Sequence, residues 1–181
     1  GDLSLTGSAG DVTLTDSSAS ADQNLAITAG KGVSLDHSNA DAANATLAMT
    51  AQDGDVALSN GSETRAGTTL DLSASNTVSL TDSDASSGDD MTLTGTDGDI
   101  TVTNGQTITG GILDAHAGDN ITLTDALAIS GAHLPGDPAP AQQDAGMTLT
   151  ADQGDLTLTR SQAQSGGDLT GEAGQNIGLT D

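Results

Sequence analysis

Aspartate is the residue type with which this chain could most readily do chemistry. The 181 residues carry 26 acidic side chains against three Lys or Arg and three His, and only Glu63 and Glu172 are glutamates. Stacked carboxylates could bind Ca²⁺, which takes about six to eight oxygen ligands. A Gly-Asp pair precedes a short stretch of alternating apolar and polar residues at six places: Asp2, Asp11, Asp55, Asp99, Asp155 and Asp168.

The spacing of these acids does not match a known calcium motif. The glycine-rich nonapeptide of calcium-binding β-rolls is absent, and the densest acidic cluster, residues 82–90, lacks the glycine spacing and terminal Glu of an EF-hand loop. Aspartate is also a common turn former, because its short carboxylate bonds nearby backbone N–H groups. We therefore interpret these residues as solvated turn aspartates and expect no cofactor, with a calcium-stabilised solenoid as an alternative.

Histidines and nucleophiles give no convincing catalytic or metal set. His37, His116 and His133 are far apart in the sequence, and there is no Cys to complete a metal site. Serine and aspartate are so frequent that a Ser-His-Asp combination would be expected by chance. A polysaccharide-active β-helix needs a cleft with aromatic and basic sugar contacts, whereas this chain has no aromatic residue. We expect no catalytic residues and no enzymatic activity, and rank the polysaccharide-active solenoid as the least favoured alternative.

Threonine pairs could form a hydroxyl-bearing surface of the ice-binding type. They occur at Thr13/Thr15, Thr101/Thr103, Thr122/Thr124 and Thr157/Thr159, but Ser34/Asp36, Ala57/Ser59 and Gly178 interrupt the row. Threonine is favoured at exposed strand positions in any case. β-Propensity therefore explains the pairs, and an ice-binding solenoid remains an alternative.

Composition excludes several partners. The net charge is −23, which argues against nucleic acid, because that ligand needs clustered cations to displace its counterions. The same deficit of bases argues against direct docking on an anionic membrane. The sequence has no apolar run of ~18 residues that could span a bilayer and no recognisable signal peptide.

The elements that position these side chains are short strands that recur about every 22 residues. Within residues 90–104, apolar and hydroxyl residues alternate with the period of two that is typical of half-buried strands. The first apolar residues of the strands form two ladders, with a single step of 35 residues between the sixth and seventh copies. We expect the first five residues of each ladder to form one continuous internal stack. The first ladder is Leu3, Leu25, Leu47, Leu70, Met91, Ile112, Met147 and Leu169; the second is Val12, Val33, Val56, Val78, Ile100, Ile121, Leu156 and Ile177.

Two strands per copy without a helical pattern predict a parallel β-solenoid, in which each copy is one coil. A weaker third strand follows the second, at residues 17–21, 38–42, 83–87, 106–109 and 161–165. We expect Ala19, Ala40, Ala85 and Ala163 to point inward there, with Ile108 and Ile129 at nearby inward places. The fold class is thus an all-β solenoid of about eight coils with a triangular cross-section. Because both termini adjoin repeat strands without a capping sequence, we expect residues 1–181 to be a single segment of a longer array.

One insertion departs from the repeat, at residues 131–146, GAHLPGDPAPAQQDAG. It contains all three prolines, and since proline cannot donate to a strand ladder, the stretch must leave the sheet. Insertions in solenoids map to surface loops that often bind partners, and proline lowers the cost of ordering such a loop. The candidate partner-contact residues are Leu134, Pro135, Asp137, Pro138 and Pro140. The alternative is a tolerated insertion without a role.

Residues 1–30, 88–105 and 147–180 resemble the filamentous haemagglutinin repeat of large exoproteins that Gram-negative bacteria export by two-partner secretion. The resemblance covers the chain outside residues 131–146. It implies a right-handed β-helical shaft, export through an outer-membrane transporter, and a secreted or cell-surface location. It also implies attachment to a host or neighbouring-cell surface, or contact-dependent delivery. The secretion, tip and toxin domains of that family have no counterpart in this sequence.

Overall fold

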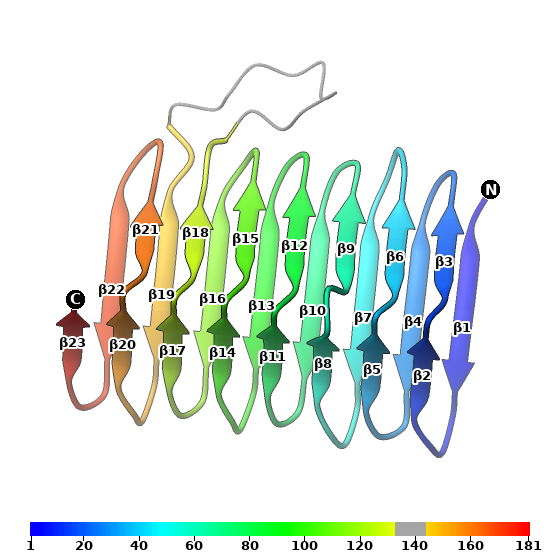
Figure 1. The fold of residues 1–181 in the computed structure, drawn as a ribbon, viewed down its shortest axis with the longest axis horizontal. Coiled ribbons are helices and arrows are strands. Elements are labelled where there is room, and N and C mark those ends of the chain that lie inside the picture. Colours follow the sequence, from blue (N-terminus) through cyan, green and yellow to red (C-terminus); the bar gives the residue numbers. More distant parts are fainter. Residues whose placement is uncertain (133–143) are drawn as a thin grey trace.

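Three parallel sheets build the described part of the chain, and each coil contributes one strand to each sheet, except the last coil, which has no strand in the third sheet (Figure 1). The computed structural model describes residues 1–132 and 144–181. We name the sheets A, B and C in the order in which each coil passes through them. This architecture confirms the predicted all-β solenoid of about eight coils.

The strands follow a strict order along the chain. Sheet A contains β1 (Leu3–Gly7), β4 (Leu25–Ala29), β7 (Leu47–Ala51), β10 (Leu70–Ala74), β13 (Met91–Gly95), β16 (Leu113–Ala117), β19 (Met147–Ala151) and β22 (Leu169–Ala173). Sheet B contains β2 (Val12–Thr15), β5 (Val33–Asp36), β8 (Val56–Ser59), β11 (Val78–Thr81), β14 (Ile100–Thr103), β17 (Ile121–Thr124), β20 (Leu156–Thr159) and β23 (Ile177–Thr180). Sheet C contains β3 (Ser18–Ala21), β6 (Asn39–Ala42), β9 (Glu63–Ala66), β12 (Asp84–Ser87), β15 (Gln106–Thr109), β18 (Leu127–Ile129) and β21 (Gln162–Gln164).

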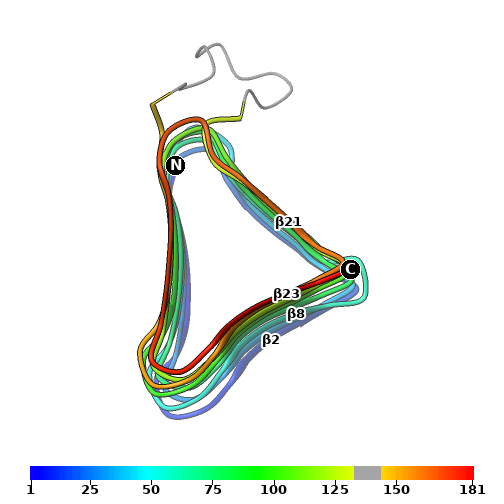
Figure 2. The same cartoon turned by 90° about the vertical axis from the view of Figure 1, so that its left-hand side faces the viewer.

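The coils form a triangular, right-handed rod. Figure 2 views it from the C-terminal end and shows the three sheets as the sides of a triangle. Each coil runs down sheet A, along sheet B and back through sheet C, so the chain turns anticlockwise while it advances toward the viewer. This sense of winding is right-handed, as the resemblance implied.

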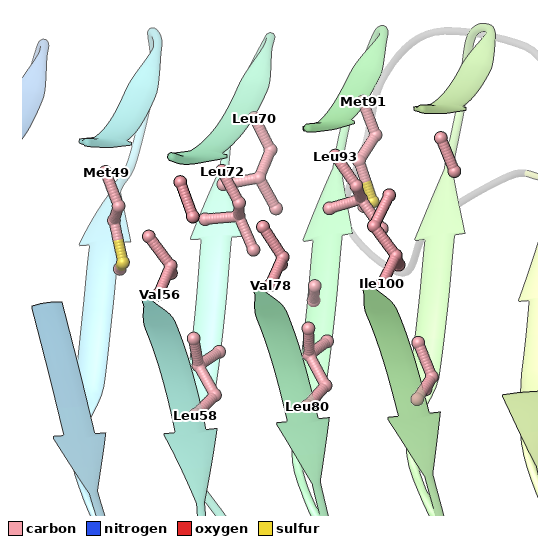
Figure 3. Packing of buried hydrophobic residues seen from close by; sticks show 14 of the residues in the cluster. Met49, Val56, Leu58, Leu70, Leu72, Val78, Leu80, Met91, Leu93 and Ile100 are labelled. Carbon is pink, nitrogen blue, oxygen red and sulfur yellow. The ribbon is translucent and has the colours of Figure 1, made fainter. Parts of the chain in front are cut away.

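The core is a stack of aliphatic side chains that point into the triangle (Figure 3). The strand register places Leu3, Leu25, Leu47, Leu70 and Met91 in one continuous row. A second row runs through Val12, Val33, Val56, Val78 and Ile100. Both predicted internal stacks are therefore confirmed. Interior coils cover their neighbours from both sides, whereas Leu179 in the last coil is 75% exposed, which illustrates that burial in a solenoid is a nearest-neighbour property.

The first ladder is wrong at one position. Leu113, not Ile112, pairs with Met91 and Met147. Ile112 lies at the preceding corner and is 49% exposed. Both residues are aliphatic, so the period alone could not choose between them. With Leu113 in place, the step across the insertion is 34 residues in sheet A and 35 in sheet B.

Sheet C confirms the predicted third side but corrects two of its residues. Ala19, Ala40 and Ala85 are buried, and Ala163 packs partly buried against the core. Ile108 and Ile129 face outward, because the buried positions of their strands are Thr107, Thr109 and Ala128. A shift of one residue reverses the face of every side chain in a strand, so the expectation that these two isoleucines point inward is one residue out of phase.

Candidate functional site

The corner between sheets A and B alternates in length from coil to coil. Four-residue turns occupy residues 8–11, 52–55, 96–99 and 152–155, and three-residue turns occupy residues 30–32, 75–77, 118–120 and 174–176. Every four-residue turn ends in Gly-Asp. The true structural unit of the rod is therefore a pair of coils rather than a single coil.

Each of these turn aspartates holds the next coil. Its Oδ1 accepts the backbone N–H of the last residue of the following short turn. The four bonds are Asp11–Gly32 at 2.9 Å, Asp55–Thr77 at 3.0 Å, Asp99–Asn120 at 2.9 Å and Asp155–Asn176 at 2.9 Å. The Gly-Asp motif is thus a clamp between coils, a role beyond the solvated turn residue that the sequence suggested.

Asparagine side chains extend the clamp into a chain of hydrogen bonds over four coils. Asn120 Nδ2 donates to Asp99 Oδ1 at 2.9 Å, and Asn120 Oδ1 accepts the N–H of Asp155 at 2.9 Å. Asp155 Oδ1 then accepts both the N–H and the Nδ2 of Asn176. Because an uncharged residue separates successive aspartates of this row, like charges do not stack at the ~4.8 Å strand spacing. That alternation was the sequence signal that could have revealed the clamp.

The corner between sheets A and C uses the same device less regularly. Asp2 Oδ1 accepts the N–H and the Nδ2 of Asn24, both at 3.0 Å. These bonds, the backbone one first, hold the pKa of Asp2 below its ordinary value. Asp90 Oδ1 accepts the N–H of Ile112 at 2.8 Å. The exposed position of Ile112 therefore follows from its place as the partner in this clamp.

The corner between sheets B and C is built from residues with a left-handed backbone. Seven successive coils place a non-glycine residue with positive φ there: Asp16, His37, Asn60, Asp82, Asn104, Asp125 and Arg160. Asp and Asn tolerate this conformation best, while His and Arg are less usual in it. At this corner too, aspartates alternate with side chains that can donate hydrogen bonds, except that the donors His37 and Asn60 follow each other.

Ion pairs and amide bonds join these corner residues between coils. His37 Nδ1 lies 3.1 Å from Asp16 Oδ1, and Asn104 Nδ2 donates to Asp82 Oδ1 at 3.2 Å. Arg160 donates from Nε and Nη2 to the two carboxylate oxygens of Asp125 at 2.7 and 2.5 Å. This bidentate pair lowers the pKa of Asp125 and raises that of Arg160.

His37 and His116, the two histidines within the described residues, lie on different coils and form separate pairs with aspartates. His116 Nε2 lies 2.9 Å from Asp152 Oδ2 on the outer side of sheet A, far along the rod from the pair formed by His37. His133 lies outside the described residues. Within residues 1–132 and 144–181, no group of three or more His, Cys, Asp or Glu side chains could hold a metal ion.

A surface hollow opens beside a short turn of the A–B corner. The turn at residues 30–32 is Gly-Lys-Gly and sits between two longer turns, so a hollow of about 450 Å³ remains. Lys31 lines it together with Asp11, Asp53 and Asp55. One cation among three carboxylates neutralises part of the local charge, and the hollow is shallow and open rather than an enclosed ligand cavity.

Threonine columns cover part of the outer face of sheet B. The register aligns Thr81, Thr103, Thr124, Thr159 and Thr180 on five successive strands. The insertion does not break this column, because β17 pairs directly with β20. The predicted interruptions at Ser34/Asp36, Ala57/Ser59 and Gly178 also lie on this face, so the regular array is confined to the C-terminal half of the rod.

The insertion leaves and rejoins the rod at the corner between sheets C and A. Ser130 Oγ donates to the carbonyl of Ala145 at 3.2 Å, and Ser165 Oγ donates to the same carbonyl at 2.9 Å. Ile121 pairs with Leu156, and Met147 stays in its row, so the predicted unbroken register across the insertion is confirmed. The candidate contact residues Leu134, Pro135, Asp137, Pro138 and Pro140 lie outside the described residues.

These features define a right-handed parallel β-solenoid whose polar side chains mostly join one coil to the next. Comparison with known proteins gives no relative: no family model, no curated protein and no solved structure matches the chain. Within the described residues there is no helix long and apolar enough to cross a membrane.

Proposed function

We propose that this chain is a shaft segment of a secreted or cell-surface bacterial exoprotein of the filamentous haemagglutinin type. In this role it mediates attachment, or contact-dependent delivery, by holding a binding region away from the cell. The supporting observation is the unbroken register of three parallel sheets, two of eight strands and one of seven, which makes a stiff rod on the order of 35 Å long at ~4.8 Å per coil. A rod in which side-chain bonds serve mainly to connect coils is suited to spacing rather than to chemistry.

The repeat resemblance at residues 1–30, 88–105 and 147–180 supplies the remaining parts of the proposal. It suggests an outer-membrane transporter as the partner during export and a host or neighbouring-cell surface, protein or glycan, as the target. The high negative charge fits a target other than nucleic acid or a bare anionic membrane. In this proposed role the protein has no enzymatic activity.

Surface labelling of the producing cells tests this function. Antibodies raised against the purified chain should label intact cells, and external protease should remove the label. The purified chain added in excess should show whether this segment itself blocks attachment or only carries the region that does. Labelling that requires permeabilised cells would overturn the proposal.

A second candidate, an ice-binding face, rests on the five-threonine column of sheet B. The column is regular and uncharged, and its neighbours Thr101, Thr122 and Thr157 add a second row. An ice-recrystallisation assay tests it. Activity that is lost in Thr124→Lys and kept in Thr150→Lys, an outward threonine of sheet A, would favour this function over the shaft.

A further inference from the structure

Large aliphatic side chains occupy outward strand positions at only one place in the described residues. These are Ile108 on β15 and Leu127 and Ile129 on β18. The other outward strand positions of residues 1–132 and 144–181 carry Thr, Ser, Ala, Gly, amide or charged side chains. Ile108 and Ile129 are direct partners in the parallel register, and Leu127 lies two residues before Ile129 on the same strand. The three residues therefore form one contiguous patch.

The patch is also uncharged, within a rod of net charge −23. Glutamines occupy the remaining outward positions of β15, β18 and β21: Gln106 pairs with Leu127, which pairs with Gln162, and Ile129 pairs with Gln164. All six outward positions of these three strands are thus neutral. Toward the N-terminus the same face turns charged, with Glu63, Arg65 and Asp84 on β9 and β12.

Two hollows of the surface lie along the edges of the patch. One hollow of about 370 Å³ is lined by Leu127, Gln106 and Gln162, and reaches the Asp125–Arg160 ion pair. A smaller hollow of about 210 Å³ lies beside Ile108 and reaches Glu63 and Asp84. Apolar side chains that are flanked by amide side chains and bordered by charged ones are the arrangement found at protein–protein interfaces.

We propose that the patch of Ile108, Leu127 and Ile129 is a docking site for a short aliphatic segment, flanked by basic residues, of a protein partner. Three strands at ~4.8 Å spacing and three residues at ~3.3 Å rise give a footprint of about 10 Å by 10–14 Å. That footprint accommodates two or three side chains, far below the roughly 800 Å² per partner of a standard stable interface. A second copy of this acidic rod is therefore a poor occupant.

The charge and the side-chain types around the patch indicate which kind of partner binds there. The border of the patch carries three carboxylates, Glu63, Asp84 and Asp125, beside two guanidinium groups, Arg65 and Arg160. This excess of carboxylates, on a rod of net charge −23, favours basic residues on either side of the docked segment. A glycan would be better served by aromatic side chains, which this chain lacks. Gln164 Nε2 already donates to Gln162 Oε1 at 2.9 Å, which leaves these two amides fewer free groups for sugar hydroxyls. This inference is independent of the shaft function, since it concerns one face of the rod in any location.

The test measures binding of a labelled peptide that alternates leucine and lysine to the whole chain, by fluorescence anisotropy at physiological salt. The double substitution Ile108→Thr with Ile129→Thr keeps strand-forming residues and should weaken binding about tenfold or more, since each aliphatic contact contributes. A peptide with serine in place of leucine, or glutamate in place of lysine, should bind at least about tenfold more weakly to the unchanged chain.

A transplanted patch is the matched control. Thr103→Ile with Thr124→Ile builds a stacked isoleucine pair on sheet B, where these two residues are register partners. In the double variant that lacks Ile108 and Ile129, this new pair should not restore peptide binding, because sheet B lacks the flanking glutamines and the hollows found beside the patch on sheet C. Circular dichroism confirms that each variant is folded.

Several outcomes would overturn the proposal. They are equal peptide binding by the unchanged chain and the double variant, equal binding of the serine peptide, or full recovery with the transplanted pair. Binding of a neutral glucan oligomer in place of the peptide would assign the patch to a glycan. A dimer that the double substitution abolishes would assign it to a second copy. A tenfold gain in peptide binding on deletion of residues 132–144 would assign it to the chain's own insertion.

Discussion

Replacing Asp99 with alanine removes one clamp between coils and should destabilise the rod measurably. Asp99 Oδ1 accepts both the N–H and the Nδ2 of Asn120 at 2.9 Å. A hydrogen bond to a charged group contributes about 1.5–3 kcal/mol, and the orphaned N–H adds a penalty only to the extent that it is shielded from water. Since Asn120 is partly exposed, we expect a loss of about 1–3 kcal/mol, which for a chain of this size lowers the Tm by about 3–10 °C.

The matched control lies in the same turn. Asp97 is exposed, and its carboxylate makes no hydrogen bond in the described structure, so Asp97→Ala removes the same charge without breaking a clamp. Asp99→Asn keeps the acceptor oxygen and should fall between the other two variants. Thermal unfolding followed by circular dichroism gives the Tm, and amide hydrogen exchange should quicken at Asn120 in Asp99→Ala alone. Equal Tm values and equal exchange for Asp99→Ala and Asp97→Ala would refute the clamp.

Three further substitutions or deletions probe the core, the surface charge and the insertion. Val56→Asp should lower the urea midpoint of unfolding far more than Thr101→Asp. Val56 is fully buried, so the introduced carboxylate would have no partner and would cost several kcal/mol. Similar midpoints for the two variants would mean that the inward and outward faces of sheet B are misassigned. Burial raises the pKa of Asp71, so the fold disfavours the ionised carboxyl and Asp71→Asn should raise the Tm at pH 7. This gain should fade as the pH falls through the raised folded pKa and be absent below the unfolded value of 3.8. Asp114→Asn, in the same column, controls for net charge, and an equal gain there would remove the burial argument. Deleting residues 132–144 leaves a four-residue corner between β18 and β19, the length of the corner at residues 43–46. The product should keep the far-ultraviolet circular dichroism and cooperative unfolding, whereas an unfolded product would contradict the register across the insertion.

The acid limit of stability should reflect the two aspartates whose pKa is lowered. Asp2 is held below its ordinary value by the bonds from Asn24, and Asp125 by Arg160. A depressed carboxyl pKa stabilises the fold at pH values above the unfolded value of 3.8, and this contribution is lost as the pH falls through the folded pKa. Arg160→Gln should therefore narrow the difference between the Tm at pH 5 and at pH 2.5, and an unchanged difference would contradict the ion pair.

The period of the sequence determined the rod because one-dimensional stacking leaves few other solutions. A row such as Leu25, Leu47 and Leu70 can bury its side chains only against equivalent residues one coil away, so spacing alone predicted both the coils and their register. The spacing also predicted that the register continues across the insertion, and Ile121 and Leu156 on either side of it are direct partners. Coil length could vary by a residue without loss of register, because the variation is taken up at the corners.

The period could not determine what happens at the corners or on the outer faces. Ile112 and Leu113 are adjacent aliphatics, and only the strand register of the folded rod shows that Leu113 takes the inward place while Ile112 lies at the corner. Ile108 and Ile129 looked like core residues because they are aliphatic, yet small Thr107 and Ala128 fill the narrow inner side of sheet C instead. Hydrophobicity predicts burial only where the space inside accepts the side chain. An aliphatic residue that faces outward against that preference is therefore the best indication, on so regular a surface, of where another molecule binds.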